Sequence, residues 1–156
     1  MINPYPGTLW SADREKAMQQ KHANSDDDLQ VLMIEDDSAV AEMYRLRLSA
    51  DGYRVTIARS GEEGLQLAGS ERPDLIYLDL RLPGMDGFEV LQRLRGAPET
   101  AEVPVIILTN FGRPELVDRG FKLGALEFLI KADTTPARLA ESAGRWTQAP
   151  SRATQR

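Results

Sequence analysis

Four short apolar runs, each followed by residues that can take part in chemistry, constrain the fold of this chain more than any other feature. They are bounded by turn-forming residues, which is typical of strands buried on both faces of a parallel sheet. Ligands of such sheets bind outside the carboxyl ends of the strands. We therefore expect one site, formed by the residues that end or follow the four runs: Glu35, Asp36 and Asp37, then Asp79, Thr109 and Lys131.

Helical patterns alternate with strands along the chain. Five strands alternating with five helices predict an α/β fold, a doubly wound five-stranded parallel sheet with right-handed crossovers and helices on both faces. This is a flavodoxin-like three-layer sandwich. The expected strands are 30–34, 53–58, 75–79, 104–109 and 126–130, and the expected helices are 38–50, 60–68, 88–95, 114–123 and 136–146.

The first of these helices shows how the bounds are chosen. Ser38 is expected to cap its N-terminus, and Asp51-Gly52 to end it, because glycine adopts positive φ without strain. Its apolar stripe, at helical spacing, is expected to consist of Val40, Met43, Tyr44, Leu46 and Leu48.

Both ends of the chain depart from this regular alternation. Residues 1–28 are expected to be a polar N-terminal extension, irregular near Pro4 and Pro6 because proline fixes its own φ and restricts its predecessor. A short helix over 12–22 is an alternative for part of it. The folded domain is then expected to cover 29–146, with 147–156 as a flexible tail.

The balance of charge argues against one class of function. The formal net charge is −5, whereas nucleic-acid-binding surfaces show a basic excess, so we expect no direct contact with nucleic acid. The chain contains no cysteine, which rules out disulfides and thiolate metal sites. No apolar run approaches the ~20 residues that span a bilayer, and the first residues lack the features of a signal peptide. We expect a cytoplasmic protein that does not enter the membrane.

Adjacent carboxylates at a strand end repel one another and lose hydration, so a structural role explains them poorly. Mg²⁺ explains them better, since it takes one or two carboxylates, waters and a phosphoryl oxygen as ligands. We expect Asp36 and Asp79 to bind it, with Glu35 acting through water. A solvated acidic turn would account for the three acids after the first strand alone. It would not account for the acid, hydroxyl and amine at the other strand ends.

These residues and the segments around them carry a resemblance to a known family. The loop 79–87 (DLRLPGMDG), and the segment 123–125 (LGA) followed by Phe128 and Lys131, are similar to the matching segments of receiver domains in two-component response regulators. No single motif is specific, but their order on successive strand ends is. The resemblance covers about 29–146.

The resemblance implies a role for each site residue, in phosphoryl transfer, metal binding or switching. The acid that ends the third strand would be the phosphorylation site. A bound Mg²⁺ would take a main-chain carbonyl as a further ligand. The catalytic residues would be Asp79, Thr109 and Lys131, the Mg²⁺ ligands Glu35, Asp36, Asp79 and the Arg81 carbonyl, and the switch residues Thr109 and Phe128.

The resemblance also implies partners. A histidine kinase or a histidine phosphotransfer protein would donate the phosphoryl group, and the surface formed by 114–123, 126–130 and 136–146 would then bind a downstream protein. The phosphorylated chain could also form a homodimer. Such a domain is a signalling module with self-phosphorylation and self-dephosphorylation chemistry only, not an enzyme.

Three departures from the family pattern stand out. Asn110 follows the switch hydroxyl where the family has a small residue, and its amide is expected either to hydrogen-bond the phosphoryl group or to shield it from water. Ala132 follows Lys131 where the family has a cis-proline, so a trans bond is expected there, since a non-proline cis bond costs ~2.5–4 kcal/mol. The third departure is that no DNA-binding output region follows the domain. We expect a stand-alone regulator, with a fragment of a longer protein as the alternative.

Other functions compete with a phospho-accepting receiver. A pseudo-receiver would bind partners without phosphorylation, and Asn110 and Ala132 are the only features in its favour. A phosphatase with an aspartyl-phosphate intermediate would need a second acid two residues after its nucleophile, where Arg81 stands. A flavodoxin-like cofactor protein is less favoured, because no phosphate-binding loop rich in Gly, Ser or Thr follows the first strand.

Overall fold

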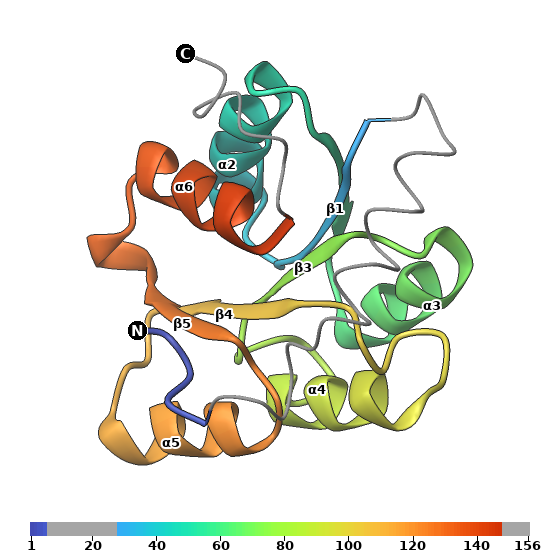
Figure 1. Ribbon diagram of the computed structural model, residues 1–156, viewed down its shortest axis with the longest axis vertical. Coiled ribbons are helices and arrows are strands. Elements are labelled where there is room, and N and C mark those ends of the chain that lie inside the picture. The colour runs from blue at the N-terminus through green and yellow to red at the C-terminus, as the bar shows by residue number, and fades with distance from the viewer. Residues whose placement is uncertain (6–27, 148–156) are drawn as a thin grey trace.

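The computed structural model describes residues 1–5 and 28–147 (Figure 1). Strands and helices alternate along it, as the sequence predicts. The strands are β1 (Gln30–Ile34), β2 (Arg54–Ala58), β3 (Leu75–Leu78), β4 (Val105–Thr109) and β5 (Glu127–Ile130). The helices are α2 (Ser38–Ala50), α3 (Gly61–Glu71), α4 (Gly87–Gly96), α5 (Pro114–Lys122) and α6 (Pro136–Thr147), with a 3-10 turn at Lys131–Asp133.

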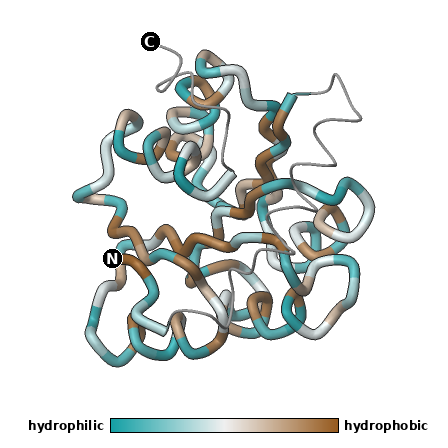
Figure 2. Tube along the Cα trace, viewed as in Figure 1, coloured by the Kyte–Doolittle hydropathy of each residue, from teal (hydrophilic) through white to brown (hydrophobic). Residues whose placement is uncertain are grey.

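All five strands are parallel and form one sheet in the order β2-β1-β3-β4-β5. The order reverses direction between β1 and β3, which creates the crevice in which ligands of doubly wound folds bind. The predicted fold class is therefore confirmed. Apolar colour follows the strands through the centre of the molecule, whereas the helices mix apolar and polar residues (Figure 2).

Helices cover both faces of the sheet, α2 and α6 on one side and α3, α4 and α5 on the other (Figure 1). Each face has its own apolar cluster, because side chains alternate between the two faces along a buried strand. Ile34 and Leu78 point toward α3 and α4, while Met33 and Tyr77 point toward α2 and α6. Both clusters reach the carboxyl ends of β1 and β3, so the residues that follow these strands start from a rigid base.

Buried hydroxyl groups fix the helices on the α2 and α6 side. Tyr44 of α2 donates its hydroxyl hydrogen to the carbonyl oxygen of Thr134 at 2.8 Å, next to the start of α6. Tyr77 of β3 donates to the carbonyl oxygen of Leu139 in α6 at 3.0 Å, and its hydroxyl lies 2.7 Å from Ser142 Oγ. Burial raises the pKa of Tyr77, so this phenol stays protonated. These bonds hold β3, α2 and α6 together behind the site.

Two predictions about the first helix are wrong. Asp37, not Ser38, caps α2: its Oδ1 accepts hydrogen bonds from the backbone N–H groups of Ala39 and Val40, at 3.0 and 3.1 Å. Met43 and Leu46 are exposed rather than part of the packed stripe. Of the five predicted stripe residues, Tyr44 and Leu48 are fully buried, and Val40 is partly buried against the same cluster. These three residues follow one another at i, i+4 spacing.

The ends of the described region also differ from expectation. Residues 1–5 are not irregular throughout, because Ile2 forms an antiparallel bridge with Glu127 at the edge of β5. Thr147, expected to start a flexible tail, is buried within the last turn of α6. The predicted helix over 12–22 lies outside the described residues. None of the helices described here is long and apolar enough to cross a membrane.

Candidate functional site

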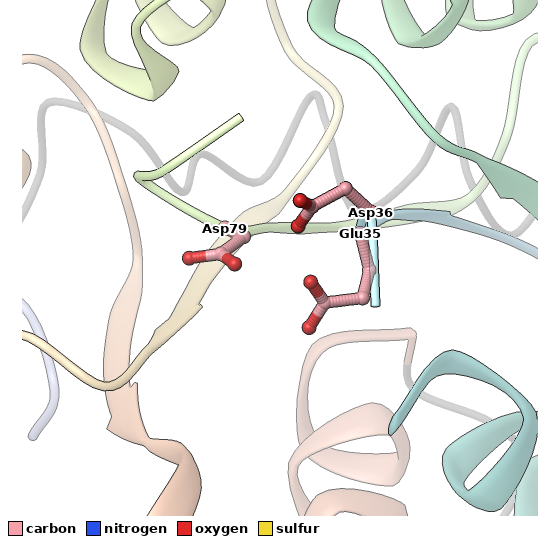
Figure 3. A group of neighbouring side chains, drawn as sticks. All are labelled: Glu35, Asp36 and Asp79. Carbon is pink, nitrogen blue, oxygen red and sulfur yellow. The ribbon is translucent and has the colours of Figure 1, made fainter. Parts of the chain in front are cut away.

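The register of the sheet brings the predicted site residues to one edge. Ile34 of β1 pairs with Leu78 of β3, so Glu35 and Asp79, each one residue farther on, leave the sheet side by side. Lys131 leaves it at the same edge, one residue after the β5 end that pairs with the end of β4. Figure 3 shows the carboxyl groups of Glu35, Asp36 and Asp79 gathered at this edge.

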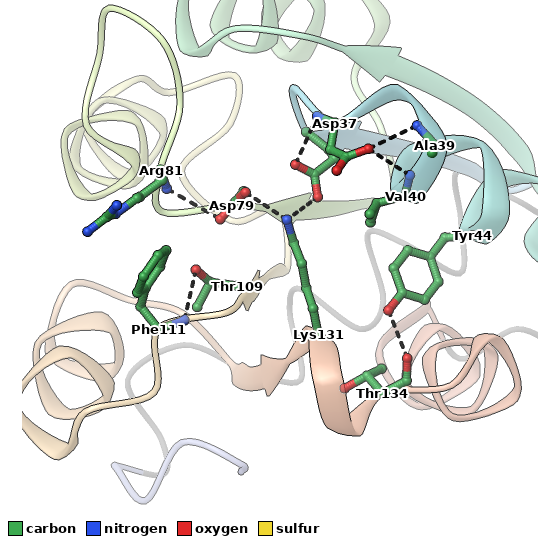
Figure 4. Close-up of polar contacts among 11 residues, drawn as sticks. Asp37, Ala39, Val40, Tyr44, Asp79, Arg81, Thr109, Phe111, Lys131 and Thr134 are labelled. Atoms are coloured by element: carbon green, nitrogen blue, oxygen red, sulfur yellow. Dashed lines mark hydrogen bonds and ion pairs between the residues drawn. The ribbon is translucent and has the colours of Figure 1, made fainter.

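Lys131 connects two of these carboxylates. Its Nζ donates a hydrogen bond to Asp79 Oδ2 at 2.8 Å and forms an ion pair with Glu35 (Figure 4). Glu35 and Asp79 are buried, and the Lys131 side chain is only 11% exposed. The lysine therefore places its positive charge between two carboxylates in a partly dry crevice, where charges interact more strongly than in water.

The crowding of acids changes the protonation of this site. Burial, followed by the charge of Asp79, raises the pKa of Glu35 to about 7, although its contact with Lys131 opposes the shift. Burial also lowers the pKa of Lys131, but its hydrogen bonds to Asp79 and Glu35 outweigh that effect and the net change is upward. Lys131 is therefore charged at neutral pH, whereas Glu35 holds its negative charge less readily than an ordinary glutamate.

The same acids fit a divalent cation. One oxygen from each of Glu35, Asp36 and Asp79 lies within 4.8 Å of the others. Glu35 Oε1 is buried, and the Lys131 ammonium is its only polar contact among the residues described here. Asp36 is exposed, which leaves one side of the cluster open to water and ligands. Hard oxygen donors with an open side are the arrangement that Mg²⁺ takes when it keeps waters and binds a phosphoryl group.

The third acid of the 35–37 run has a different role. Asp37 Oδ1 accepts hydrogen bonds from the N–H groups of Ala39 and Val40 in the first turn of α2, and the Asp37 N–H lies 3.3 Å from Glu35 Oε2. Asp37 thus starts the helix and holds the loop that carries Glu35 and Asp36. Within this run, one acid is a helix cap and two remain for metal binding.

A glycine fixes the loop after Asp79. The backbone of Gly87 packs against Asp79 and Leu80 so closely that an added Cβ would lie 2.5 Å from the Asp79 carbonyl oxygen. The Gly87 N–H donates to the Leu80 carbonyl oxygen at 3.0 Å, and the Arg81 N–H lies 3.3 Å from Asp79 Oδ1. Gly87 belongs to the predicted loop 79–87, and its physical role became visible only in the structure.

Thr109 and its loop form the opposite wall. Thr109 is fully buried, and its Oγ1 accepts a weak hydrogen bond from the Phe111 N–H at 3.4 Å, so in this structure the hydroxyl is bonded to its own loop (Figure 4). The guanidinium of Arg81 stacks on the Phe111 ring, with its carbon 4.0 Å from the ring centre. This stack links the two loops above Asp79. The sequence offered no signal for it.

Phe128 lies behind this wall rather than beside Asp79. Its side chain is 1% exposed and meets the ring of Phe121 edge-on, with ring centres 6.5 Å apart. The peptide bond after Lys131 is trans, like every other peptide bond of the described residues. The structure thus brings Glu35, Asp36, Asp79 and Lys131 together, and leaves Thr109 and Phe128 as neighbours whose switching role is a prediction.

Comparison with known proteins agrees with this geometry. The family model for the response regulator receiver domain matches residues 31–143. The chain belongs to the receiver family of response regulators. This receiver is 30% identical to the chemotaxis protein CheY4 of Vibrio cholerae, whose solved structure superposes with a TM-score of 0.71 and covers 76% of this chain and 98% of CheY4. The resemblance predicted from the motifs is therefore confirmed.

Curated relatives of this receiver include two transcriptional regulators. The transcriptional regulatory protein AfsQ1 of Streptomyces coelicolor is 45% identical over 101 residues, which cover 65% of this chain and 44% of AfsQ1. The phosphate regulon transcriptional regulatory protein PhoB of Rhizobium meliloti is 39% identical over 112 residues, covering 70% and 48% of the two chains. This receiver therefore spans about half the length of the curated relatives it matches.

Proposed function

We propose that this receiver accepts a phosphoryl group on Asp79 from the phosphohistidine of a histidine kinase or histidine phosphotransfer protein. The observation that supports this most strongly is the pairing of Asp79 with Lys131 in a buried acidic crevice at the carboxyl end of β3. Asp79 is held in place by hydrogen bonds from Lys131 and the Arg81 N–H, one to each carboxylate oxygen. A nucleophile fixed in this way loses little freedom on reaching the transition state.

In the proposed reaction, a carboxylate oxygen of Asp79 forms a bond to phosphorus as the bond between phosphorus and the donor imidazole nitrogen breaks. The imidazole leaves with the electron pair and takes up a proton. Lys131 supplies a fixed positive charge beside the transferred group. Bound Mg²⁺, held by Asp36, Asp79 and the Arg81 carbonyl with Glu35 beside it, would neutralise charge on the phosphoryl oxygens.

The proposed switch follows from the weak bond of Thr109. Its hydroxyl is held only by the long contact to the Phe111 N–H among the described hydrogen bonds. A phosphoryl group on Asp79 offers stronger, charged acceptors, so the hydroxyl would turn toward it and draw the loop after β4 along. The surface of α5, β5 and α6 would change as a result and bind a downstream protein.

Intact-mass measurement tests the proposal directly. With Mg²⁺ and a small phosphodonor such as acetyl phosphate, the parent should gain one phosphoryl group that hydroxylamine removes, and Asp79→Asn should gain none. Asp37→Asn is the matched control, since asparagine also caps helices well and this acid is engaged by α2. Equal labelling of Asp79→Asn would refute the assignment. A parent that stays unlabelled would favour the pseudo-receiver.

A further inference from the structure

The outer edge of the sheet is covered by residues 1–5, a segment that we call the clasp. β5 is an edge strand, and its outer N–H and C=O groups can pair with another chain segment. The N–H of Phe128 donates to the Met1 carbonyl oxygen at 2.8 Å, and the Met1 amino group donates to the Phe128 carbonyl oxygen at 3.0 Å. The N–H of Asn3 donates to the Leu126 carbonyl oxygen at 2.8 Å. The clasp thus runs beside β5 and pairs with it through an antiparallel bridge (Figure 1).

The side chain of Asn3 secures the clasp. Its amide group donates to the carbonyl oxygens of Phe121 and Ala125, at 3.1 and 2.6 Å, near the end of α5. Phe121 lies in the last turn of α5, and Ala125 lies in the turn between α5 and β5. The Tyr5 N–H closes a turn onto Asn3 Oδ1, and the Tyr5 hydroxyl donates to Asp118 of α5 at 2.8 Å. The clasp therefore bridges β5 and α5.

Hydrogen bonds, not burial, hold the clasp in place. Met1 and Ile2 remain 56% and 52% exposed, so little apolar surface is removed from water when they dock. Water competes with hydrogen bonds at such an exposed edge, and each contributes little net stability there. A contact with these properties forms in the resting protein but can be displaced by a better-fitting segment.

Side chains of α6 hold the strand beneath the clasp. The buried carboxylate of Glu127 accepts hydrogen bonds from Trp146 and Arg145 of α6, at 2.7 and 3.0 Å. This side chain ties β5 to α6, while its main chain pairs with Ile2. The edge of β5 is therefore a surface of the kind to which extended peptides bind by strand addition.

We propose that the clasp is a releasable cover of the β5 edge: it pairs with this strand in the resting protein and leaves it when the receiver is activated, which frees the outer N–H and C=O groups of β5. The link to activation rests on the proposed function. Phe128, the residue expected to move with Thr109, supplies both the N–H and the C=O that anchor Met1. Its ring packs against Phe121, whose carbonyl anchors Asn3. Movement of Phe128 would thus disturb both anchor points of the clasp.

Backbone hydrogen exchange, followed residue by residue by NMR, tests the clasp in the full chain. The Phe128 amide faces the clasp, so its exchange should be slow in the parent and rise about tenfold in Asn3→Ala, which loses the three hydrogen bonds of the Asn3 side chain. The Leu129 amide faces β4 by strand alternation and should not change. Gln92→Ala, which shortens an exposed amide side chain of α4, should leave both rates as in the parent. A Phe128 amide that is unprotected in the parent, or unaffected by Asn3→Ala, would overturn the proposal.

Treatment with Mg²⁺ and acetyl phosphate tests the link to activation. The Phe128 amide of the parent should then exchange several-fold faster, while that of Asp79→Asn should not respond. If intact mass shows full labelling but the exchange rate stays the same, clasp release is not coupled to phosphorylation and this part of the inference fails. If no labelling occurs, the proposed function fails, and the Asn3→Ala comparison still decides whether the clasp exists.

Discussion

The acidic crevice and the β5 edge use the same sheet in opposite ways. In the crevice, Glu35, Asp79 and Lys131 are almost completely buried and are placed by strands that pair over their whole length. At the edge, residues 1–5 remain largely exposed and are placed by a few hydrogen bonds to β5 and α5. One region is fixed by the core of the domain, and the other rests on its surface.

This difference indicates which part of a receiver can be adjusted without changing its chemistry. Groups that follow buried strands keep their geometry unless the sheet itself is altered, so their spacing suits a reaction. A segment held by exposed hydrogen bonds opens at little cost, so it suits control of access. Substitutions in the crevice should therefore change metal binding or phosphorylation without opening the clasp, and Asn3→Ala should do the reverse.

The largest effect is expected at the exposed acid of the crevice. Asp36→Ala removes a proposed direct ligand and should weaken Mg²⁺ binding by about 10- to 100-fold. Titration of Mg²⁺ by calorimetry measures this. Asp37→Asn should bind Mg²⁺ nearly as well as the parent, and protection of the Phe128 amide should be unchanged in both. Equal affinity of Asp36→Ala and the parent would remove Asp36 from the metal site.

The next effect concerns the loop that positions Asp79. Gly87→Ala should lower the free energy of unfolding by about 1–3 kcal/mol, because the new methyl group meets main-chain atoms of Asp79 and Leu80 that have no room to move. Urea denaturation measures the change. Gly69→Ala is the matched control, since nothing lies within 4 Å of that position in α3, and helical alanine should raise stability by about 0.5–1 kcal/mol. Equal effects of both substitutions would show that the Gly87 contact is not tight.

A smaller effect is expected when charge is removed from the crevice. In the folded state the pKa of Glu35 is raised to about 7, so folding favours its protonated form. The corresponding stability is present below the ordinary glutamate pKa and is lost as pH rises through about 7. Glu35→Gln without Mg²⁺ should therefore be more stable than the parent at pH 8, on the order of 1 kcal/mol, with a smaller difference at pH 5. Thermal unfolding at the two pH values checks this, and a variant less stable at pH 8 would contradict it.

The smallest effect is expected at the mouth of the crevice. Asn110 is exposed and follows the buried Thr109, next to the stack of Arg81 on Phe111. Asn110→Ala should shorten the half-life of the phosphorylated state about two- to threefold, because water reaches phosphorus more easily along the in-line path. Loss of label after removal of the donor, followed by intact mass, gives the half-life. An equal or longer half-life would show that Asn110 is not a shield.

The crevice could be predicted from the sequence because it depends on local patterns, namely short apolar strands and the residues that directly follow them. Four apolar runs predicted buried parallel strands. Because parallel strands have their carboxyl ends at one edge of the sheet, Asp79 and Lys131 were expected at the same edge. The role of the neighbouring acids was harder to assign. Asp37 and Ser38 are both good helix caps, and only the backbone geometry decides which of them accepts from the first free N–H groups.

Contacts between distant segments were the part that the sequence could not supply. The clasp joins Asn3 to carbonyl groups about 120 positions away, and main-chain pairing of this kind leaves no pattern in the side chains. The Arg81–Phe111 stack joins two loops whose approach depends on how β3 and β4 pair. By itself, the sequence determined the parallel α/β fold and the order of acid, hydroxyl and amine along its strand ends, because periodicity and strand direction are encoded residue by residue. The tertiary structure alone decided which acid caps a helix and what covers the edge of β5, because both depend on backbone groups that every residue carries alike. It also decided where Phe128 packs, because that depends on how β5 and α5 approach each other.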